Sequence, residues 1–369
     1  MFRRIYIHNY RCLENFDLPI SGKSSTLLIG KNGSGKSTLG KALQLFQSMA
    51  RGTNRVGELL KIEDFSQGRI DAPIRFEIEV SIGGVDYAYK LALEMPAGFK
   101  EMRVFEETLV QNGIAIYERN RAQVSLNKTF TNNEAKFLVD WHLVALPLIQ
   151  EQSEKDPLSI FKGWLARMLI LAPIPSLITG DSKGDSLFPN LEVTNFGEWF
   201  SGLLAHSPAA YSHVDKYIRQ IMPDFRDIKN PVVGKDSRSL TVQFYQDQAT
   251  ISLPFMGLSD GEKCFFICAL LMAANDAYGP VFCFWDEPDN YLPLSEVGHF
   301  VMQLRSSFSA GGQLLVTSHN SEAIPQFSNE NILLLYRRSH LEPTQVRAVA
   351  DIAFHGNLVD ALIRDDLEP

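Results

Sequence analysis

The sequence predicts an α/β fold with a mixed sheet, an antiparallel β lobe and an inserted helical subdomain. Helices and strands alternate from residue 260 to residue 335, which is typical of a parallel α/β sheet. Period-two alternation from about Pro73 to Ser125 indicates antiparallel strands, and apolar segments from about 132 to 222 indicate helices. We therefore expect three parts: residues 1–130, a helical insertion at 131–235, and residues 236–369.

The N-terminal elements follow from local patterns. Residues 2–8 and 25–29 have the composition of short strands, and the second strand is apolar enough to be fully buried. Apolar residues recur at helical spacing over 36–50 and predict a helix with one buried face. Ile82-Gly83-Gly84-Val85 predicts a hairpin turn between two strands.

The later elements are predicted in the same way. Segments rich in Trp, Phe and Leu favour helices, and short apolar runs bounded by turn residues favour strands. The expected helices span about 135–150, 157–172, 196–221, 260–275 and 294–308. The expected strands span about 238–246, 249–255, 281–285, 313–317 and 331–335.

Composition places the chain among soluble globular proteins. Of its 369 residues, 45% are hydrophobic and 21% are charged, which excludes a disordered tail or a fibre. The longest strongly apolar stretch, 265–274, is half of the roughly 20 residues that a membrane helix needs. The N-terminus turns polar too early for a signal peptide, and four cysteines fit a reducing compartment. We expect a cytoplasmic protein without membrane contact.

The charge is unevenly distributed along the chain. The whole chain has a net charge of −8, yet residues 1–60 carry a net positive charge and residues 241–369 a net negative one. This asymmetry is compatible with an anionic ligand, nucleic acid included, or with pairing between the two ends of the chain. Charge alone does not decide between these alternatives.

A phosphate-binding motif is the strongest chemical signal. The segment Gly30–Thr38 (GKNGSGKST) matches G-x-x-x-x-G-K-[ST] and lies between a buried strand and an amphipathic helix. Its backbone N–H groups can surround phosphates; Lys36 would reach the β- and γ-phosphates, and the Ser37 hydroxyl would bind Mg²⁺. A glycine-rich turn without a ligand is the alternative. The expected nucleotide contacts are Gly30, Asn32, Gly33, Ser34, Gly35, Lys36, Ser37 and Thr38.

Two further motifs follow predicted strands. Asp286 and Glu287 come directly after the apolar strand 281–285, so they would lie at the carboxyl edge of a parallel sheet, where ligands of α/β proteins bind. Asp286 can hold Mg²⁺ and Glu287 can activate a water molecule. His319 follows the next strand and would contact the γ-phosphate. The alternatives are a solvated turn for the carboxylates and a structural role for the histidine.

The segment Leu258–Lys263 (LSDGEK) precedes the helix 260–275. Ser259 is a good N-cap, and Glu262 three residues later completes a capping box. Capping therefore explains this segment without a ligand. Ser259 and the N–H group of Gly261 at a helix N-terminus could also bind a phosphate.

Taken together, these motifs resemble the ABC-type ATPases, the head domains shared by transporters, SMC-related proteins, RecF and the OLD family. The segment Ile5–Phe16 (IYIHNYRCLENF) resembles the first strand of RecF/OLD-type ATPases. Phe284–Pro293 (FWDEPDNYLP) and Thr317–Ile324 (TSHNSEAI) resemble their later motifs. The motif-bearing parts span about 1–65 and 238–335, so the first and third parts would be the two halves of a P-loop ATPase head.

The resemblance implies roles for individual residues. ATP would be sandwiched in a homodimer between the phosphate loop of one head and the signature residues Ser259 and Gly261 of the other. Asp286 would ligate Mg²⁺, Glu287 would be the catalytic base and His319 would sense the γ-phosphate. Two further positions are implied, a phosphate-side arginine and a glutamine that contacts Mg²⁺: Arg11, otherwise a surface arginine, and Gln67.

Departures from the pattern narrow the expected function. Pro293 stands where transporters place an aspartate, and no coiled coil separates the motifs. About 34 residues follow the last predicted strand, too few for the nuclease domain of OLD proteins. We expect a Mg²⁺-dependent ATPase acting as the sensor or regulatory subunit of a bacterial antiphage or toxin system, beside a separate nuclease or toxin effector. The alternative is a RecF-like repair ATPase acting on DNA; a transporter motor or a non-hydrolysing scaffold is less favoured.

Overall fold

The computed structural model describes residues 1–369 except 128–134, 152, 355 and 365–369. The chain divides into two compact units. Unit 1 consists of Met1–Lys23, Leu28–Met168 and Asn329–Pro369, and unit 2 of Ser24–Leu27 and Leu169–Ser328. The expected boundary between residues 130 and 131 lies outside the described residues, and the division at 235 stays a prediction.

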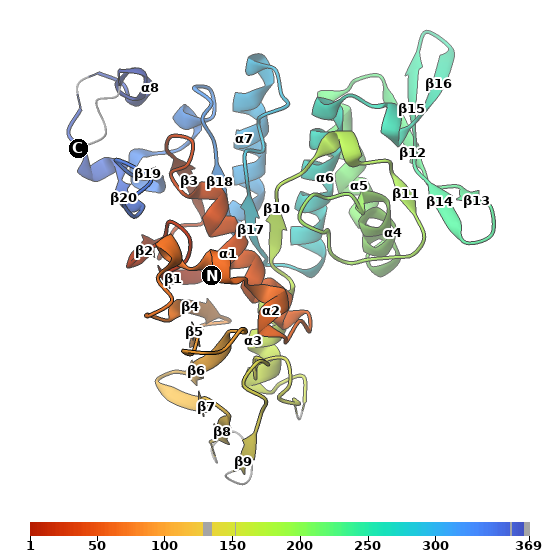
Figure 1. The fold of residues 1–369 in the computed structure, drawn as a ribbon. Helices are drawn as coiled ribbons and strands as arrows, with labels where there is room; N and C mark the ends of the chain where they lie inside the picture. The colour runs from red at the N-terminus through yellow and green to blue at the C-terminus, as the bar shows by residue number, and fades with distance from the viewer. Residues whose placement is uncertain (128–134, 152, 355, 365–369) are drawn as a thin grey trace. The chain divides into compact units, whose positions relative to one another are not determined.

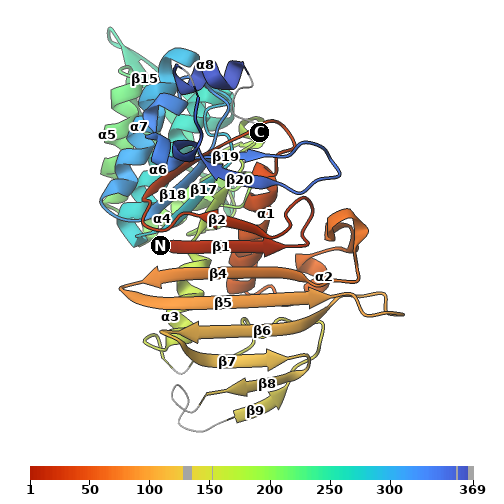
Figure 2. The same ribbon diagram turned by 90° about the vertical axis from the view of Figure 1, so that its left-hand side faces the viewer.

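Unit 1 contains the predicted antiparallel β lobe. An eight-stranded sheet has the order β2-β1-β4-β5-β6-β7-β8-β9, and Figure 2 shows these strands side by side. The Gly83-Gly84 turn joins β4 to β5 with positive φ at both glycines, as the sequence predicts. The strands are β1 (Phe2–His8), β2 (Phe16–Pro19), β4 (Ile74–Ile82), β5 (Val85–Glu94), β6 (Arg103–Gln111), β7 (Ile114–Asn120), β8 (Gln123–Leu126) and β9 (Ala135–Leu138).

Two helices of unit 1 contact each other and this sheet: α1 (Lys36–Ala50) and α3 (Pro157–Ala166). The buried face of α1 places Phe46 edge-on to the rings of Phe76 and Tyr89. Asp156 caps α3 by accepting a hydrogen bond from the N–H group of Leu158 at 2.9 Å. The remaining helices of unit 1 in the described chain are short: α2 (Val56–Leu59) and α8 (Leu358–Ile363).

The helix expected at 135–150 is absent from the structure. Its first residues form β9, and none of the described residues between β9 and α3 is helical. The carboxylate of Glu107 accepts hydrogen bonds from the N–H groups of Ala145 and Leu146, at 2.7 and 2.8 Å. These bonds replace the intrahelical ones, so a long-range partner overrides the local helical pattern.

The expected helix at 157–172 also ends early. After α3 the chain continues into β10 (Leu169–Leu171), a strand of unit 2. β10 pairs in parallel with β17 (Phe282–Trp285), which pairs in parallel with β18 (Gln313–Thr317). The three residues of β10 are apolar and fully buried. Their composition would also fit the end of a helix, and only the parallel pairing with β17 makes them a strand.

The chain passes from unit 2 to unit 1 within β3 (Ser25–Ile29). In unit 2 the strand order is β10-β17-β18-β3. In unit 1, β3 lies beside β19 (Ile332–Tyr336), and β20 (Gln345–Ala348) runs antiparallel to β19. Parallel and antiparallel pairings therefore both occur, as the mixed α/β fold predicted from the sequence requires.

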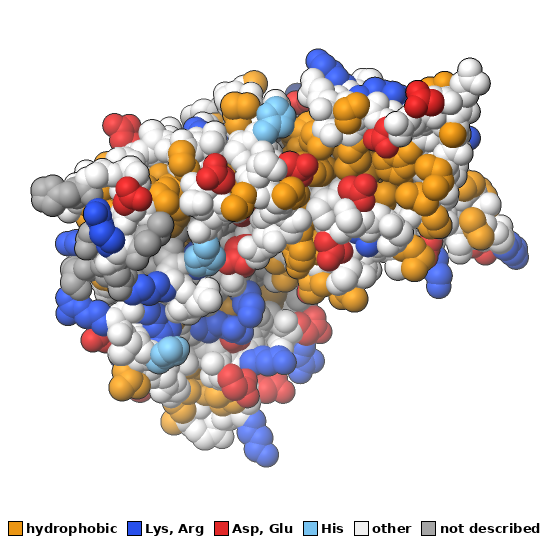
Figure 3. Space-filling model, turned by 90° about the horizontal axis from the view of Figure 1, so that it is seen from above, with side chains coloured by type: hydrophobic (Ala, Val, Ile, Leu, Met, Phe, Trp, Pro, Cys, Tyr) orange, Lys and Arg blue, Asp and Glu red, His pale blue; other side chains and the backbone are white. Residues whose placement is uncertain are grey.

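Helix α6 (Asp260–Tyr278) is the core of unit 2. It is buried on nearly every side, and α4 (Phe196–His206), α5 (Ala210–Ile221) and α7 (Leu294–Ser309) contact it. Figure 1 shows small sheets beside these helices. Their strands are β11 (Asp181–Ser182), β12 (Phe225–Lys229), β13 (Val232–Val233), β14 (Ser237–Ser239), β15 (Thr241–Gln246) and β16 (Ala249–Pro254). Figure 3 shows hydrophobic side chains gathered on part of the surface. In this region Val232, Ile251 and Met256 are exposed.

Candidate functional site

The phosphate-loop motif lies between β3 and α1, as expected, and its glycines are sterically required. Gly30 has a φ of 150°, and a Cβ there would stand 2.0 Å from the carbonyl oxygen of Leu335. Gly35 has a φ of 102°, and its Cβ would stand 2.9 Å from the Thr344 hydroxyl. A side chain at either position would force the loop to change shape.

Lys36 folds back over this loop. Its side chain is buried, and Nζ donates hydrogen bonds to the carbonyl oxygens of Gly30 at 2.6 Å and Lys31 at 3.3 Å. The hydroxyl of Ser34 is buried without a hydrogen-bond partner. A buried ammonium group and an unpaired hydroxyl within a backbone cradle suit a bound phosphate, which would supply the acceptor oxygens.

The remaining residues of the phosphate loop differ in how far they are exposed to solvent. Ser37, the expected Mg²⁺ ligand, is exposed at the first turn of α1, as is Asn32 in the loop itself. Thr38 is half-buried, and its hydroxyl is 3.8 Å from the Cys12 thiol. An exposed hydroxyl at the N-terminus of α1 is compatible with a cation held beside phosphates.

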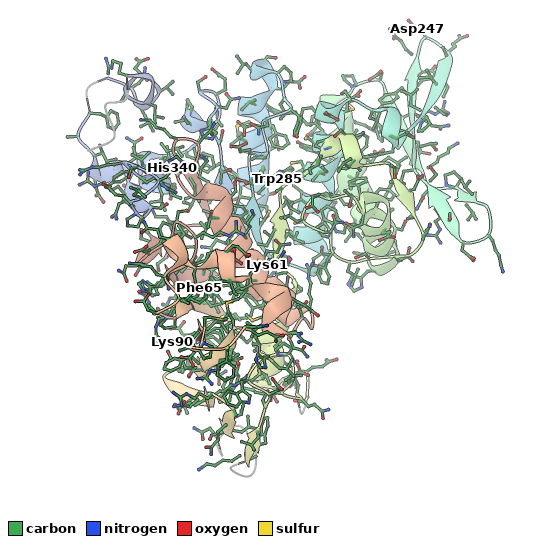
Figure 4. The ribbon with its side chains drawn as sticks, viewed as in Figure 1. Lys61, Phe65, Lys90, Asp247, Trp285 and His340 are labelled. Carbon is green, nitrogen blue, oxygen red and sulfur yellow. The ribbon has the colours of Figure 1, made fainter. Side chains whose placement is uncertain are left out.

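Arg11 and Gln67 both have protein partners in unit 1. Arg11 pairs with the Asp64 carboxylate at 2.7 Å, and its φ is 52°. Gln67 also has a φ of 52° and donates from its side-chain amide to the carbonyl oxygen of Leu341. Figure 4 labels Lys61 and Phe65, which flank the short 3-10 helix Ile62–Asp64. Their roles toward phosphate and Mg²⁺ stay predictions.

In unit 2, two neighbouring strand ends bring Asp286 and Glu287 together with the end of β18. Thr317, the last residue of β18, donates its hydroxyl to Asp286 Oδ1 at 2.6 Å. The same oxygen atom of Thr317 accepts the N–H group of Glu287 at 2.9 Å. Figure 4 labels Trp285, which directly precedes this pair on β17. Thr317 thus fixes both carboxylate-bearing residues, a role that sequence reasoning missed although it quoted the residue.

Glu287 and His319 form a close acid–base pair. His319 Nε2 is 3.0 Å from Glu287 Oε1, and their side chains are 38% and 31% exposed. Glu287 has a φ of 50°, an uncommon conformation for a residue other than glycine. Asn290, which the sequence did not single out, donates to the other carboxylate oxygen. A solvent-accessible carboxylate held between two donors is able to take a proton from water.

Asp289 is a buried carboxyl group close to the same strand end. It is 3% exposed and accepts a hydrogen bond from the Ser318 hydroxyl at 2.7 Å. Burial raises the pKa of the Asp289 carboxyl, although the Ser318 hydrogen bond opposes that shift. The contact joins the segment after β17 to the residue before His319.

The signature segment forms the predicted capping box. The Ser259 hydroxyl accepts the N–H group of Glu262 at 3.3 Å, and the Glu262 carboxylate accepts the N–H group of Ser259 at 2.7 Å. A Cβ on Gly261 would stand 2.9 Å from the Tyr291 carbonyl oxygen, so a glycine fits closely there. Ser259 is exposed at the start of α6, and its phosphate role stays a prediction.

The comparisons with known proteins agree with this set of motifs. The sequence profile of the family described as "AAA domain, putative AbiEii toxin, Type IV TA system" matches residues 25–324, well over half of the chain. The chain belongs to this family. As an AAA-domain protein it is a P-loop ATPase, and both the phosphate loop and the carboxylate–histidine pair lie within the matched residues.

Curated and solved relatives of this AAA-domain protein are more distant. The energy-coupling factor transporter ATP-binding protein EcfA2 of Lactococcus lactis subsp. lactis (strain IL1403) is 28% identical over 186 residues. The match covers 50% of this chain and 56% of the relative, so the chain spans about half the length of that relative.

Two solved structures share the fold of the AAA-domain protein. An SMC head bound to the C-winged helix domain of ScpA aligns with a TM-score of 0.56 at 14% identity, covering 95% of this chain and 98% of that one. An SMC head with an extended coiled coil from Pyrococcus furiosus, bound to the C-terminal domain of ScpA, has a TM-score of 0.50 at 11% identity, covering 100% and 99%. The expected head fold is therefore confirmed.

Metal-binding clusters and membrane-spanning helices are both absent from the part of the chain that the structure describes. Across the residues that the structure describes, no group of three or more His, Cys, Asp or Glu side chains could hold a metal ion. Within the same described residues, every helix is too short or too polar to cross a bilayer.

Proposed function

We propose that this AAA-domain protein hydrolyses ATP with Mg²⁺, and that the predicted residues carry out the steps. Lys36 binds the β- and γ-phosphates, Ser37 and Asp286 hold Mg²⁺, and Glu287 deprotonates the attacking water. Arg11 and Gln67 exchange their protein partners for the phosphates and the cation. Proton transfer from water to Glu287 leads to hydrolysis only when the nucleotide is bound.

The observation that carries this proposal is the Glu287–His319 pair at 3.0 Å. Its side chains are partly exposed, so water and a phosphate can reach them. The Thr317 hydroxyl and the Asn290 amide hold the carboxylates in place before a ligand arrives. Preorganisation of this kind lowers the cost of reaching the transition state.

We further propose that ATP joins two copies of the chain. In the proposed dimer, Ser259 and Gly261 of one copy contact the γ-phosphate bound by the other copy. Support comes from the exposure of Ser259 at the N-terminus of the 19-residue helix α6, whose positive end favours an anion. Hydrolysis would release the two copies, so the dimer is a two-state switch.

The proposed biological role is a sensor or regulatory subunit with a separate nuclease or toxin effector. The description of the family, which names a toxin–antitoxin system, supports this role. The rival proposal is a RecF-like ATPase that acts on DNA. In the rival case, duplex DNA should stimulate hydrolysis.

The first experiment compares three variants in phosphate release and in molecular mass with ATP and Mg²⁺. Lys36→Ala should lose nucleotide binding or turnover, because the contact with the β- and γ-phosphates is gone. Glu287→Gln should bind ATP, turn over about 10²–10⁴-fold more slowly and accumulate as a dimer. Ser259→Arg in the Glu287→Gln background should stay monomeric and still bind ATP. Normal turnover by Glu287→Gln would overturn the assignment of the base.

The second experiment addresses the biological role. Tagged Glu287→Gln protein is purified with ATP from its source cells, and co-purifying molecules are identified. A nuclease or toxin-like protein in stoichiometric amount would support the effector proposal. Copurifying DNA and repair proteins, with hydrolysis stimulated by duplex DNA, would instead support the RecF-like alternative.

A further inference from the structure

The loop that joins β19 to β20 lies against the phosphate loop within unit 1. Arg337 donates from its guanidinium to the carbonyl oxygen of Gly33 at 3.3 Å. The Thr344 hydroxyl donates to the carbonyl oxygen of Ser34 at 2.9 Å. His340, labelled in Figure 4, belongs to this loop, and its Nε2 is 3.9 Å from where a Cβ of Gly33 would stand. Neither the motif analysis nor the proposed reaction uses these residues.

Both donors are fixed by other contacts. Thr344 is 2% exposed, and its N–H group donates to the carbonyl oxygen of Cys12 at 2.8 Å. Arg337 Nε donates to the carbonyl oxygen of Ser339 at 2.9 Å. These contacts fix the β19–β20 loop in place. In both of its hydrogen bonds to the phosphate loop, the β19–β20 loop supplies the donor and the phosphate loop supplies the carbonyl acceptor.

The direction of these hydrogen bonds matters for anion binding. A phosphate loop binds an anion through its N–H groups, so those groups must face the ligand and the carbonyl groups must face away. The outward carbonyls of Gly33 and Ser34 are successive, and each receives a donor from the β19–β20 loop. An outward carbonyl without a donor would lose this restraint, and the peptide groups could rotate.

We propose that Arg337 and Thr344 are positioning residues that hold the phosphate loop in the conformation that binds a nucleoside di- or triphosphate. The inference rests on the proposed function, because it requires that the loop binds ATP. The two residues act through the loop and do not touch the reacting atoms. They set the affinity for the nucleotide, and the rate of the chemical step is independent of them.

The test measures equilibrium binding of ATP and ADP, together with kcat, for Arg337→Gln and Thr344→Val. Each variant should weaken both nucleotides by the same factor, about 5- to 10-fold, as expected for the loss of one hydrogen bond. The kcat should change less than about twofold. Two matched variants should bind like the wild type: Thr344→Ser, which keeps the hydroxyl, and Arg338→Gln, which removes the neighbouring exposed arginine.

Several outcomes would overturn the inference. Equal weakening by Arg338→Gln and Arg337→Gln would reduce the effect to general electrostatics. Wild-type affinity in both Arg337→Gln and Thr344→Val would show that these residues do not position the loop. Binding by Thr344→Ser as weak as that by Thr344→Val would contradict the role of the Thr344 hydroxyl. If Thr344→Val does not fold, the half-buried Arg337 still provides the test. No binding of ATP by the wild type would instead refute the proposed function itself.

Discussion

Two acid–base pairs in this molecule have similar chemistry and opposite surroundings. In unit 1, Glu107 lies 3.6 Å from Arg119, and both side chains are 0% exposed. In unit 2, Glu287 lies 3.0 Å from His319, with about a third of each side chain exposed. The first pair stabilises the fold, and the second is accessible to a ligand.

The buried pair has every bond supplied by the protein. Glu107 accepts hydrogen bonds from the Tyr89 and Tyr117 hydroxyls at 3.0 and 2.7 Å, besides those from the 145–146 backbone. Arg119 donates to backbone carbonyl groups, among them that of Asp140 at 2.8 Å. Burial lowers the pKa of Arg119, and the charge of Glu107 opposes that shift. Such a network fixes chain positions and leaves no place for a substrate.

The exposed pair is arranged differently. Glu287 keeps contact with solvent, and its left-handed backbone conformation is unfavourable for a residue with a side chain. Its side-chain partners are His319, which follows β18, and Asn290 in the turn after β17, and a ligand could replace either of them. Exposure combined with backbone strain therefore points to function, whereas burial combined with complete hydrogen bonding points to structure.

The largest expected effect breaks the buried pair. Glu107→Gln leaves the Arg119 charge buried without a counter-charge, so the free energy of unfolding should fall by about 3–5 kcal/mol. Denaturant unfolding measures this change. The control is Glu106→Gln, which removes the neighbouring, more exposed carboxylate paired with Arg75 and should cost less than about 1 kcal/mol. Similar losses in both variants would contradict the distinction.

The second effect concerns turnover. His319→Asn removes a hydrogen bond to a charged group worth about 1.5–3 kcal/mol, so ATP turnover should fall roughly 10- to 100-fold. The unfolding free energy should change by less than about 1 kcal/mol, because the pair is partly exposed. His142→Asn is the matched control, since His142 pairs with Asp140 at the same 3.0 Å and has no proposed catalytic role. A stability loss without a turnover defect would reassign His319 to structure.

The smallest effect is a pH dependence at Asp289. Its pKa is raised in the folded protein by burial, so the neutral carboxyl is favoured there. Relative to Asp289→Asn, the wild type should match at acidic pH and lose stability as the pH rises through that raised pKa. Glu287 and His319 are the charged neighbours that modify this titration, in opposite directions. Unfolding measured from pH 4 to pH 8 tests the sign, and a relative gain by the wild type at high pH would contradict it.

The motifs with a local cause were predictable from the sequence. The Gly83-Gly84 turn and the Ser259–Glu262 capping box depend on residues within a few positions of one another. The phosphate-loop glycines adopt positive φ values, which is a local backbone requirement, although the atoms that exclude a Cβ there belong to Leu335 and Thr344. Carboxylates after a buried strand were also predictable, because strand ends present side chains at a sheet edge.

Contacts between distant residues were not predictable. Nothing local indicates that Glu107 would take the N–H groups of residues 145 and 146 and prevent a helix there. Nothing local places Thr344 on the carbonyl of Ser34, 310 positions earlier in the chain. Each of these contacts depends on a pairing that exists only once the chain has folded.

The sequence by itself determined which elements form around the motifs and which chemistry their residues offer. Backbone preferences and short-range hydrogen bonds act over a few residues, so they can be predicted from the order of residues along the chain. The tertiary structure decided which polar groups become buried and paired, which stay exposed, and which distant loop supports the phosphate loop. Burial and long-range pairing depend on the packing of the whole unit, so only the folded chain distinguishes the structural pair Glu107–Arg119 from the candidate catalytic pair Glu287–His319.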